Sequence, residues 1–299
     1  MRSVYLIDGF NLVFRCFYAV KGLSRKDGFP TNAIHGWIKS LWKLADSYQP
    51  DECIVIFDVG EDTYRQELLP SYKAQRKETP PELLQQVPVI KELTLAMGLP
   101  TVFSEGIEAD DLLAALARQR REQGWLVRIV SADKDLAQCV GDGVALLLPP
   151  PSANAKQGWR LLESEGVEEK FGVKPSQIAD YLALIGDTSD NIPGLPGVGP
   201  KTAAKWLQQY GTLASVLDHS ADLQPARFQT LVADQREALH RNLRLTTLRR
   251  EVPLPPLNQP SADSRRLFAL LEEMEMKNAL TEARRRYPTS GQAEFDFGG

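Results

Sequence analysis

The segment Leu126-Val127-Arg128-Ile129-Val130-Ser131-Ala132-Asp133-Lys134-Asp135 joins a short apolar run to two acids. A short apolar run bounded by polar residues is typical of a fully buried strand. Amphipathic stretches with helical spacing separate such runs, and this alternation predicts a mainly parallel α/β sheet flanked by helices. The expected strands cover residues 3–7, 53–57, 126–130 and 144–148, and expected helices between them cover 33–48 and 109–123.

Three of the expected strands end at an aspartate, namely Asp8, Asp58 and Asp133. In parallel sheets, ligands bind beyond the carboxyl ends of the strands. One aspartate in such a place would be explained as a turn residue, whereas three together indicate a functional edge.

Further acids stand at the start of the expected helix 109–123. Glu108 and Asp111 share a helix face, and compensation of the helix dipole is their alternative role. Carboxylates this close cannot all ionise unaided, and divalent cations remove the conflict. Oxygen ligands suit Mg²⁺ or Mn²⁺, and this many acids predicts two ions. The candidate metal residues are Asp8, Asp58, Glu108, Asp110, Asp111, Asp133, Asp135, Asp187 and Asp190.

The last two of these acids lie in a segment that also carries a Gly/Pro-rich turn, Gly186-Asp187-Thr188-Ser189-Asp190-Asn191-Ile192-Pro193-Gly194-Leu195-Pro196-Gly197-Val198-Gly199-Pro200-Lys201-Thr202-Ala203. A glycine-rich turn before a helix leaves N–H groups free to bind phosphate. The surrounding pattern is all-helical and rich in arginine, which favours backbone contacts to nucleic acid, with a solvated helix face as the alternative. Helices are expected at 163–170, 175–185, 201–210, 224–248 and 265–286.

The net charge of −4 does not exclude a nucleic-acid partner. Without the nine candidate metal acids, 30 acids face 35 bases, which leaves +5. No apolar run approaches the roughly 18–20 residues of a membrane span, and no signal peptide is evident. Three scattered cysteines indicate free thiols in a reducing compartment, so we expect a cytoplasmic protein without a membrane partner. The sequence also lacks a Walker A loop and clustered histidines, which argues against nucleotide-driven work and a zinc site.

Residues 59–98 differ in character from the rest. Within them, residues 64–82 mix charges, aromatic residues and prolines with little apolar periodicity. This pattern predicts an excursion that projects from the sheet, and a plain surface linker is the alternative.

Five motifs, taken in order, resemble those of the bacterial and phage 5′-nucleases. They are Ile7-Asp8-Gly9, Phe57-Asp58, Glu108-Ala109-Asp110-Asp111, Ser131-Ala132-Asp133-Lys134-Asp135 and the first half of segment 186–203. This flap-endonuclease superfamily includes the 5′→3′ exonuclease domain of DNA polymerase I, and the resemblance covers residues 3–255. It implies a PIN-like sheet domain followed by a helix–three-turn–helix module with a helix-hairpin-helix turn. The domains expected are 1–162 (nuclease, with 59–98 as arch or gateway), 163–256 (DNA binding), 257–286 (C-terminal helix) and 287–299 (disordered tail).

The resemblance also implies roles for the acids. Asp58, Glu108 and Asp110 would hold one metal, while Asp135, Asp187 and Asp190 would surround the second. Asp133 would lie between the two. Asp8 and Asp111 would act through ligand water or by orienting the ligands.

Other roles follow from the same resemblance. Tyr72, Lys73 and Arg76 match the Tyr-Lys-x-x-Arg pattern of the family's arch. Lys73 and Arg76 would neutralise the scissile phosphate, and Tyr72 would stack on the neighbouring base. The hairpin would bind a potassium ion through carbonyls such as those of Leu195 and Val198. It would contact DNA through Gly194, Leu195, Gly197, Val198, Gly199, Lys201 and Thr202.

We therefore expect a two-metal 5′→3′ exonuclease or flap endonuclease that cuts DNA near single-strand/duplex junctions, in replication or repair. It is expected to be a stand-alone, monomeric, nucleoid-associated enzyme, with RNA–DNA primers as further candidate substrates. The tail residues Gln292, Phe295 and Phe297 faintly resemble peptides that dock on the bacterial sliding clamp. The alternatives are a PIN-type ribonuclease and a structure-specific DNA-binding protein without catalysis.

Overall fold

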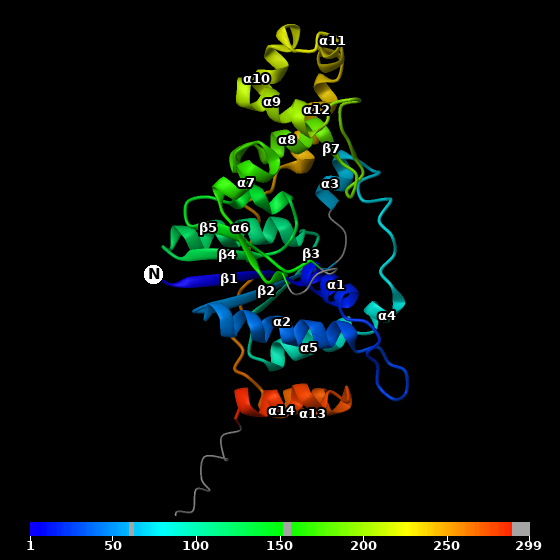
Figure 1. Ribbon diagram of the computed structural model, residues 1–299, viewed down its shortest axis with the longest axis vertical. Coiled ribbons are helices and arrows are strands. Elements are labelled where there is room, and N and C mark those ends of the chain that lie inside the picture. The colour runs from blue at the N-terminus through cyan, green and yellow to red at the C-terminus, as the bar shows by residue number, and fades with distance from the viewer. Residues whose placement is uncertain (60–62, 152–156, 289–299) are drawn as a thin grey trace, which may run out of the picture.

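A six-stranded sheet occupies the middle of an elongated molecule (Figure 1). The computed structural model describes residues 1–59, 63–151 and 157–288, and the side chains of residues 58, 59 and 63 lie outside this description. The strand order is β3-β2-β1-β4-β5-β6, with the first five strands parallel and β6 antiparallel to β5. The strands are β1 (Ser3–Asp8), β2 (Glu52–Val59), β3 (Thr101–Glu105), β4 (Leu126–Val130), β5 (Val144–Leu148) and β6 (Arg160–Leu162).

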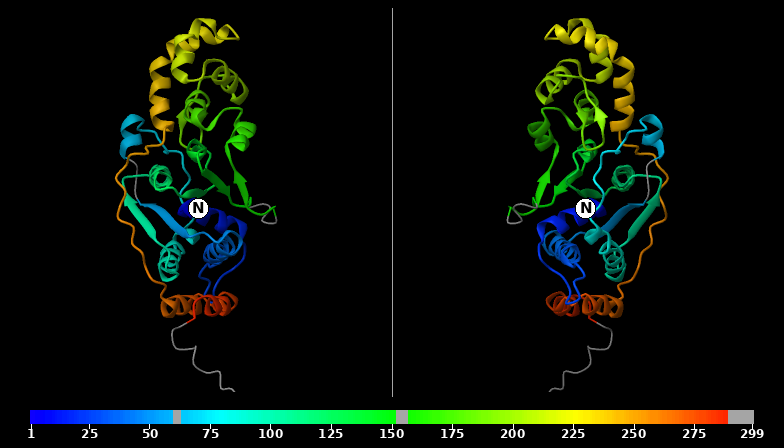
Figure 2. Two further views of the ribbon diagram at one scale, coloured as in Figure 1. Left: turned by 90° about the vertical axis from the view of Figure 1, so that its left-hand side faces the viewer. Right: turned by 90° about the vertical axis from the view of Figure 1, so that its right-hand side faces the viewer.

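Helices cover both faces of this sheet. Alternate residues of a strand point to opposite faces, so Leu6 of β1 packs with α6 while Ile7 packs with α1 and α2. A final helix pair, α13 and α14, covers α5 and α2 from below, as two further views also show (Figure 2). The helices around the sheet are α1 (Gly9–Ala19), α2 (Asn32–Tyr48), α4 (Pro81–Leu84), α5 (Val87–Ala96), α6 (Ala109–Glu122), α13 (Ser264–Glu273) and α14 (Lys277–Arg286). The short helix α3 (Thr63–Leu68) lies above the sheet and contacts the helical module (Figure 1).

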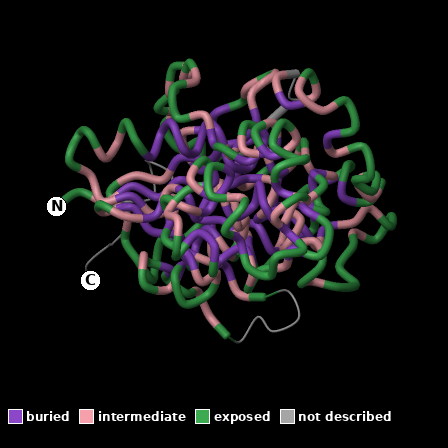
Figure 3. Tube along the Cα trace, turned by 90° about the horizontal axis from the view of Figure 1, so that it is seen from above, coloured by how far each residue is buried: buried purple, intermediate pink, exposed green. Residues whose placement is uncertain are grey.

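A helical module stands above the sheet. Its apolar core is continuous with the face of the sheet that α6 covers, because one cluster of buried side chains runs from Leu112 to Leu182 and Trp206. Seen from above, buried chain fills the centre and exposed chain lies in the outer loops (Figure 3). The module contains α7 (Ser164–Phe171), α8 (Ile178–Ile185), β7 (Gly186–Asp187), β8 (Ile192–Pro193), α9 (Pro200–Tyr210), α10 (Leu213–Asp218), α11 (Arg227–Asp234) and α12 (Arg236–Thr246), with 3-10 turns at Pro175–Gln177 and Ser220–Asp222. A further 3-10 turn, Asp135–Cys139, follows β4 in the sheet domain.

All four expected strands are present, but two more strands of the six-stranded sheet were not predicted, and neither was the short β7–β8 hairpin. β3 is an edge strand with only two buried residues, and β6 has three residues, so neither shows a long apolar run. The single helix expected at 224–248 is wrong, because Gln235 separates α11 from α12. The single helix expected at 265–286 is also wrong, since Glu275 takes a positive φ of 55° between α13 and α14.

The last part of residues 59–98, which were predicted as the arch or gateway region, belongs to the core. In α5, Ile90, Leu93 and Ala96 recur at helical spacing and are buried beneath the sheet. The extended part is therefore limited to the chain that runs from α3 down to α4 (Figure 1). Within the described residues, no helix is long and apolar enough to cross a membrane.

Candidate active site

Parallel pairing brings the predicted acids of β1 and β4 to one edge of the sheet. Ile7 pairs with Val130, so Asp8 and the residues after Val130 leave the sheet side by side. The buried Asp8 carboxylate accepts hydrogen bonds from the backbone N–H of Asn11 (3.1 Å) and the hydroxyl of Ser131 (2.8 Å). Ser131 in turn accepts a bond from the Asp133 N–H (3.0 Å), so the turn after β4 is held in a fixed shape.

The start of α6 adds two acids to this edge. Glu108 is the N-cap residue and Asp110 lies in the first turn, where the helix dipole stabilises negative charge. Burial, followed by the charge of Asp133 and other neighbouring acids, raises the pKa of Asp110 well above its usual value. An acid held in such surroundings favours a bound proton or a bound cation.

A second group of acids comes from two parts of the chain. Carboxylate oxygens of Asp135, Asp187 and Asp190 lie within 4.8 Å of one another. Burial and the charges of Asp133 and Asp187 raise the pKa of Asp135 well above its usual value. Burial also favours the neutral form of Asp187, but hydrogen bonds from Lys134 and Ser189 outweigh it and hold the pKa of Asp187 below its usual value.

We call Asp8, Glu108, Asp110, Asp133, Asp135, Asp187 and Asp190 the acidic cluster. The Asp135 Oδ1 atom is buried without a hydrogen-bond partner, which is costly unless a cation binds there. The ligands offered are all hard oxygens, the type that suits small divalent cations rather than soft metals. The acidic cluster therefore fits divalent metal ions.

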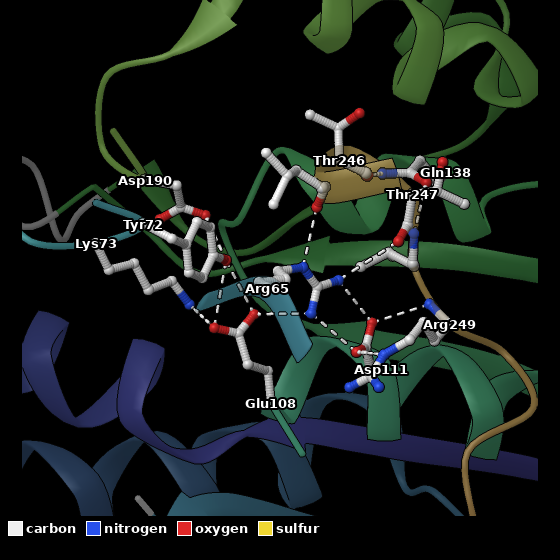
Figure 4. Close-up of polar contacts among 12 residues, drawn as sticks. Arg65, Tyr72, Lys73, Glu108, Asp111, Gln138, Asp190, Thr246, Thr247 and Arg249 are labelled. Atoms are coloured by element: carbon white, nitrogen blue, oxygen red, sulfur yellow. Dashed lines mark hydrogen bonds and ion pairs between the residues drawn. The ribbon is translucent and has the colours of Figure 1, made fainter. Parts of the chain in front are cut away.

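The predicted arch residues reach this cluster (Figure 4). The Tyr72 hydroxyl lies 3.1 Å from Glu108 Oε2 and 3.2 Å from Asp190 Oδ2, and burial followed by the charge of Glu108 raises the pKa of Tyr72. Lys73 forms an ion pair with Glu108. Arg76 donates to Asp190 over 2.8 Å, and the Lys73 N–H donates to the Asp190 carbonyl over 3.0 Å. The arch cations therefore already pair with the acids predicted to hold metal.

Two of the nine predicted metal residues are not placed in the cluster. The side chain of Asp58 lies outside the described part of the chain. Asp111 is fully buried, and both its oxygens accept bonds from Arg65 at 2.9 Å, while Arg249 binds it at 2.7 Å (Figure 4). Because guanidinium groups fill its coordination positions, we do not assign Asp111 to a metal.

Sequence reasoning missed several supporting residues. Lys134 pairs with Asp187 at 2.7 Å, and its place between Asp133 and Asp135 was the only signal for it. The buried Arg65 had no sequence signal, because a lone arginine in a charged segment resembles a surface residue.

The predicted DNA-binding hairpin forms the turn that leads into α9. Leu195 and Val198 are buried and anchor the turn, and the Val198 N–H donates to the Leu195 carbonyl over 3.0 Å. Gly199 is the N-cap residue, so Lys201 and Thr202 lie in the first turn of the helix. A Cβ atom on Gly194 would lie 2.1 Å from the Ile185 carbonyl oxygen, so only glycine fits there.

Comparison with known proteins agrees with this architecture. Residues 3–172 match the family model for the 5'-3' exonuclease N-terminal resolvase-like domain, and residues 173–266 match that for the 5'-3' exonuclease C-terminal SAM fold. The chain belongs to the 5'-3' exonuclease family. This exonuclease is 37% identical to the 5'-3' exonuclease of Aquifex aeolicus over 293 residues, which is 98% of this chain and 99% of the relative. It is 39% identical to the thermostable DNA polymerase I of Thermus aquaticus over 281 residues, 93% of this chain but only 33% of the polymerase.

Solved structures show the same fold. The T5 5'-exonuclease with bound zinc superposes with a TM-score of 0.68 at 24% identity, covering 94% of this exonuclease and 100% of that chain. The catalytic core of Rad2 in complex with DNA substrate gives a TM-score of 0.61 at 16% identity, covering 94% and 92%. The predicted α/β domain followed by a helical module is therefore confirmed, as is the predicted 5′→3′ exonuclease family, although the module also contains the short β7–β8 hairpin.

Proposed function

We propose that this exonuclease hydrolyses phosphodiester bonds of DNA at 5′ ends and flaps, close to the junction of single strand and duplex. The observation that carries the proposal is that Lys73 and Arg76 of the arch meet the acidic cluster. Acids in excess require cations, and cations on the facing segment suit a phosphate placed between them. Two solved relatives support a DNA substrate, since the T5 D15 flap endonuclease is described in a pseudo-enzyme-product complex with DNA and metal ions, and Rad2 with DNA substrate.

Two divalent ions, Mg²⁺ or alternatively Mn²⁺, would complete the acidic cluster. Glu108 and Asp110, with Asp58, would hold one ion, Asp133 would lie between the sites, and Asp8 would orient water or ligands. The second ion would be held by Asp135, Asp187 and Asp190, whose oxygens already lie within 4.8 Å of one another. Such ions lower the pKa of water and stabilise the charge on the leaving oxygen.

The arch residues would exchange partners when substrate binds. Lys73 leaves Glu108 and Arg76 leaves Asp190, and both then neutralise the scissile phosphate. Tyr72 gives up its bonds to the two acids, which frees its ring to stack on a base. Metal ions held by the acidic cluster would take the place of the departing cations beside Glu108 and Asp190, so the acids would stay compensated.

The hairpin before α9 would hold the duplex at a distance from the cut. Backbone N–H groups at the start of α9, with the side chains of Lys201 and Thr202, suit a phosphate. Carbonyls of the turn, including those of Leu195 and Val198, are the proposed potassium ligands. The other residues proposed to contact DNA are Gly194, Gly197 and Gly199.

The central test replaces one acid that belongs to both metal sites. We expect Asp133→Asn to abolish cleavage of a 5′-labelled flap in Mg²⁺ while binding of the junction in Ca²⁺ is largely kept. The matched control Asp222→Asn changes an exposed acid of the helical module and should cut at the wild-type rate. Full activity of Asp133→Asn would end the two-metal assignment.

Cleavage assays also distinguish two alternative functions. A PIN-type ribonuclease would cut RNA faster than DNA or an RNA–DNA junction, yet it gives the hairpin no purpose. A DNA-binding protein without catalysis would show no product in Mg²⁺ over a long time course. The DNA nuclease is favoured because two acids of the acidic cluster, Asp187 and Asp190, share the segment 186–203 with the hairpin.

Further proposals concern the protein's organisation and partners. The domain bounds 1–162, 163–256, 257–286 and 287–299 stay proposals, as do a monomeric state, a cytoplasmic place near the nucleoid and RNA–DNA primers as substrates. The residues proposed to bind a sliding clamp, Gln292, Phe295 and Phe297, lie outside the described residues. A pull-down that compares the full chain with one ending at Pro288 tests the clamp, and equal retention would refute it.

A further inference from the structure

The chain that leaves α12 is held by side chains of the nuclease domain at five successive backbone positions. Arg65 donates to the carbonyls of Leu245 (2.9 Å) and Thr247 (3.4 Å). Gln138 donates to the Thr246 carbonyl (2.8 Å) and accepts from the Leu248 N–H (3.2 Å). The Arg249 N–H donates to Asp111 over 2.9 Å. We call residues 245–249 the pinned segment (Figure 4).

The groups that hold the pinned segment are themselves fixed. Arg65 is 2% exposed and Asp111 is 0% exposed, and two parallel bonds of 2.9 Å join them. The Arg249 guanidinium adds a bond of 2.7 Å to Asp111 and lies 4.5 Å from the centre of the Tyr64 ring on α3. A buried, doubly hydrogen-bonded ion pair has one geometry, so it fixes direction as well as distance.

The same arginine touches the acidic cluster and the base of the arch. Arg65 Nη1 lies 3.2 Å from Glu108 Oε2. Arg65 belongs to α3, from which the chain continues directly to Tyr72 and Lys73. One side chain therefore joins the arch, the first acid of α6 and the end of α12.

The end of α12 in turn fixes the rest of the module. The buried Asn242 donates to the carbonyls of Pro193 (2.6 Å) and Ala183 (3.2 Å), which ties α12 to β8 and α8. The hairpin that precedes α9 follows β8 directly. A change in direction at the pinned segment is therefore passed to the part of the module proposed to hold the duplex.

We infer that Arg65, Asp111 and Gln138 set the orientation of the helical module relative to the nuclease domain, and thereby the position along the strand at which DNA is cut. They are positioning residues, because they act through the backbone of the pinned segment. The inference rests on the proposed nuclease function only for its second test.

The first test measures orientation without using activity. Spin labels at Gln119→Cys on α6 and Gln209→Cys on α9, both exposed positions, report the distance between domain and module. Burial raises the pKa of Cys16 to about 11 and those of Cys53 and Cys139 to about 12, so the native thiols label slowly. The distance distribution should be narrow in the parent and broader or shifted in the variants.

Two variants remove the contacts in different ways. Gln138→Ala removes two bonds to the pinned segment and no charge. The double variant Arg65→Met/Asp111→Leu removes both partners of the buried pair together, which avoids leaving one buried charge unpaired. The matched control is Arg118→Ala. Like Asp111, Arg118 lies on α6, and it also contacts the chain that follows α12, but its partner there is the exposed Glu251 (2.7 Å).

The second test maps the cut on a 5′-labelled flap under single-turnover conditions. The parent and the control should give one main product. Both variants should spread the product over neighbouring positions and lower the rate about 10- to 100-fold, the loss typical of a misplacement near 1 Å. Affinity for the flap in Ca²⁺ should change little.

Each result decides one part of the inference. A narrow, unchanged distance distribution in both variants overturns the assignment of orientation. A changed distance with an unchanged product overturns the link to cut position, as does a rate loss that follows only the fraction of unfolded protein. If the parent cuts no flap at all, the proposed function fails, while a changed distance still supports the role in orientation.

Discussion

Replacing Asp135 by asparagine should stabilise the metal-free protein and remove much of its response to metal. Burial and the neighbouring charges of Asp133 and Asp187 raise the pKa of Asp135, and one of its oxygens has no hydrogen-bond partner. Asparagine resembles the protonated acid in shape and, like it, carries no charge. The substitution therefore removes the repulsion and also removes a ligand of the proposed second metal.

The sign and size follow from the direction of the pKa shift. An aspartate whose pKa is higher in the folded than in the unfolded state binds more protons when folded, so stability is lost as pH rises above about 4. The loss continues up to the folded pKa and amounts to about 1.4 kcal/mol for each unit of elevation. One such unit corresponds to roughly 2 °C in Tm for a chain of 299 residues. At pH 7.5 without metal, Asp135→Asn should therefore melt higher than the parent, by about this amount for each unit of elevation.

Metal should reverse the order of the melting temperatures of the parent and Asp135→Asn. An ion present at 100 times its Kd stabilises the folded state by about 2.7 kcal/mol, which is roughly 4 °C in Tm for 299 residues. The parent should gain an increment of this size in Mg²⁺, and Asp135→Asn should gain clearly less. Asp222→Asn, at an exposed acid, controls for the loss of one charge.

Differential scanning calorimetry at pH 5.5, 6.5 and 7.5, with EDTA or with Mg²⁺, provides the measurement. In EDTA the parent should lose stability across this range as pH rises, whereas Asp135→Asn should lose less. The low pKa of Asp187 does not mask the trend, because stability that depends on a lowered pKa is lost only at more acidic pH. A metal-free Asp135→Asn that melts below the parent would refute the reasoning.

Three further predictions concern the arch, the hairpin and α12. Lys73→Ala and Arg76→Ala should each lower the single-turnover cleavage rate about 100-fold while the Kd for the flap in Ca²⁺ changes little, and a defect confined to binding would contradict their placement at the phosphate. Gly194→Ala should lower Tm strongly, because its Cβ would lie 2.1 Å from a backbone oxygen. The control Gly199→Ala, with no atom within 4 Å of its Cβ, should melt like the parent. Equal Tm values for the two variants would count against the close packing of the hairpin. Asn242→Leu should cost about 1–3 kcal/mol in urea unfolding, since it removes the buried side-chain donor to the carbonyls of Ala183 and Pro193, and an unchanged midpoint would show that these bonds contribute nothing.

The central strands could be predicted because burial on both faces of the sheet leaves mostly apolar runs. β1 and β4 lie in the middle of the sheet, so most of their residues alternate between two apolar layers, and the half-buried Arg128 of β4 is the exception. β3 and β6 form the two edges of the sheet, where solvent permits polar residues and the run is interrupted. Edge strands are therefore the part of such a sheet that apolar patterns identify least well.

In the candidate site, too, some residues could be placed from the sequence and others could not. Asp8 and Asp133 could be placed together because parallel strands end at one edge, which is a property of topology rather than of particular contacts. The ion-pair partner of Asp111 could not be predicted, because helical periodicity indicates which helix face Asp111 occupies but not which side chain contacts it. That partner, Arg65, comes from a segment without apolar periodicity, so nothing in the sequence indicates that it is buried.

The acidic cluster depends on the direction of the helical module, because part of the cluster belongs to that module. Asp187 pairs with Ile192 across the β7–β8 hairpin, and Asn242 of α12 binds the carbonyl of the next residue, Pro193. Any rotation of α12 would therefore carry Asp187 away from Asp135, which is fixed to the turn after β4 through Asp133. Contacts that fix α12 against the nuclease domain would therefore maintain the positions of both the metal ligands and the hairpin proposed to hold the duplex. On this reasoning the orientation of the module and the spacing of the second group of acids should change together in any variant of the pinned segment.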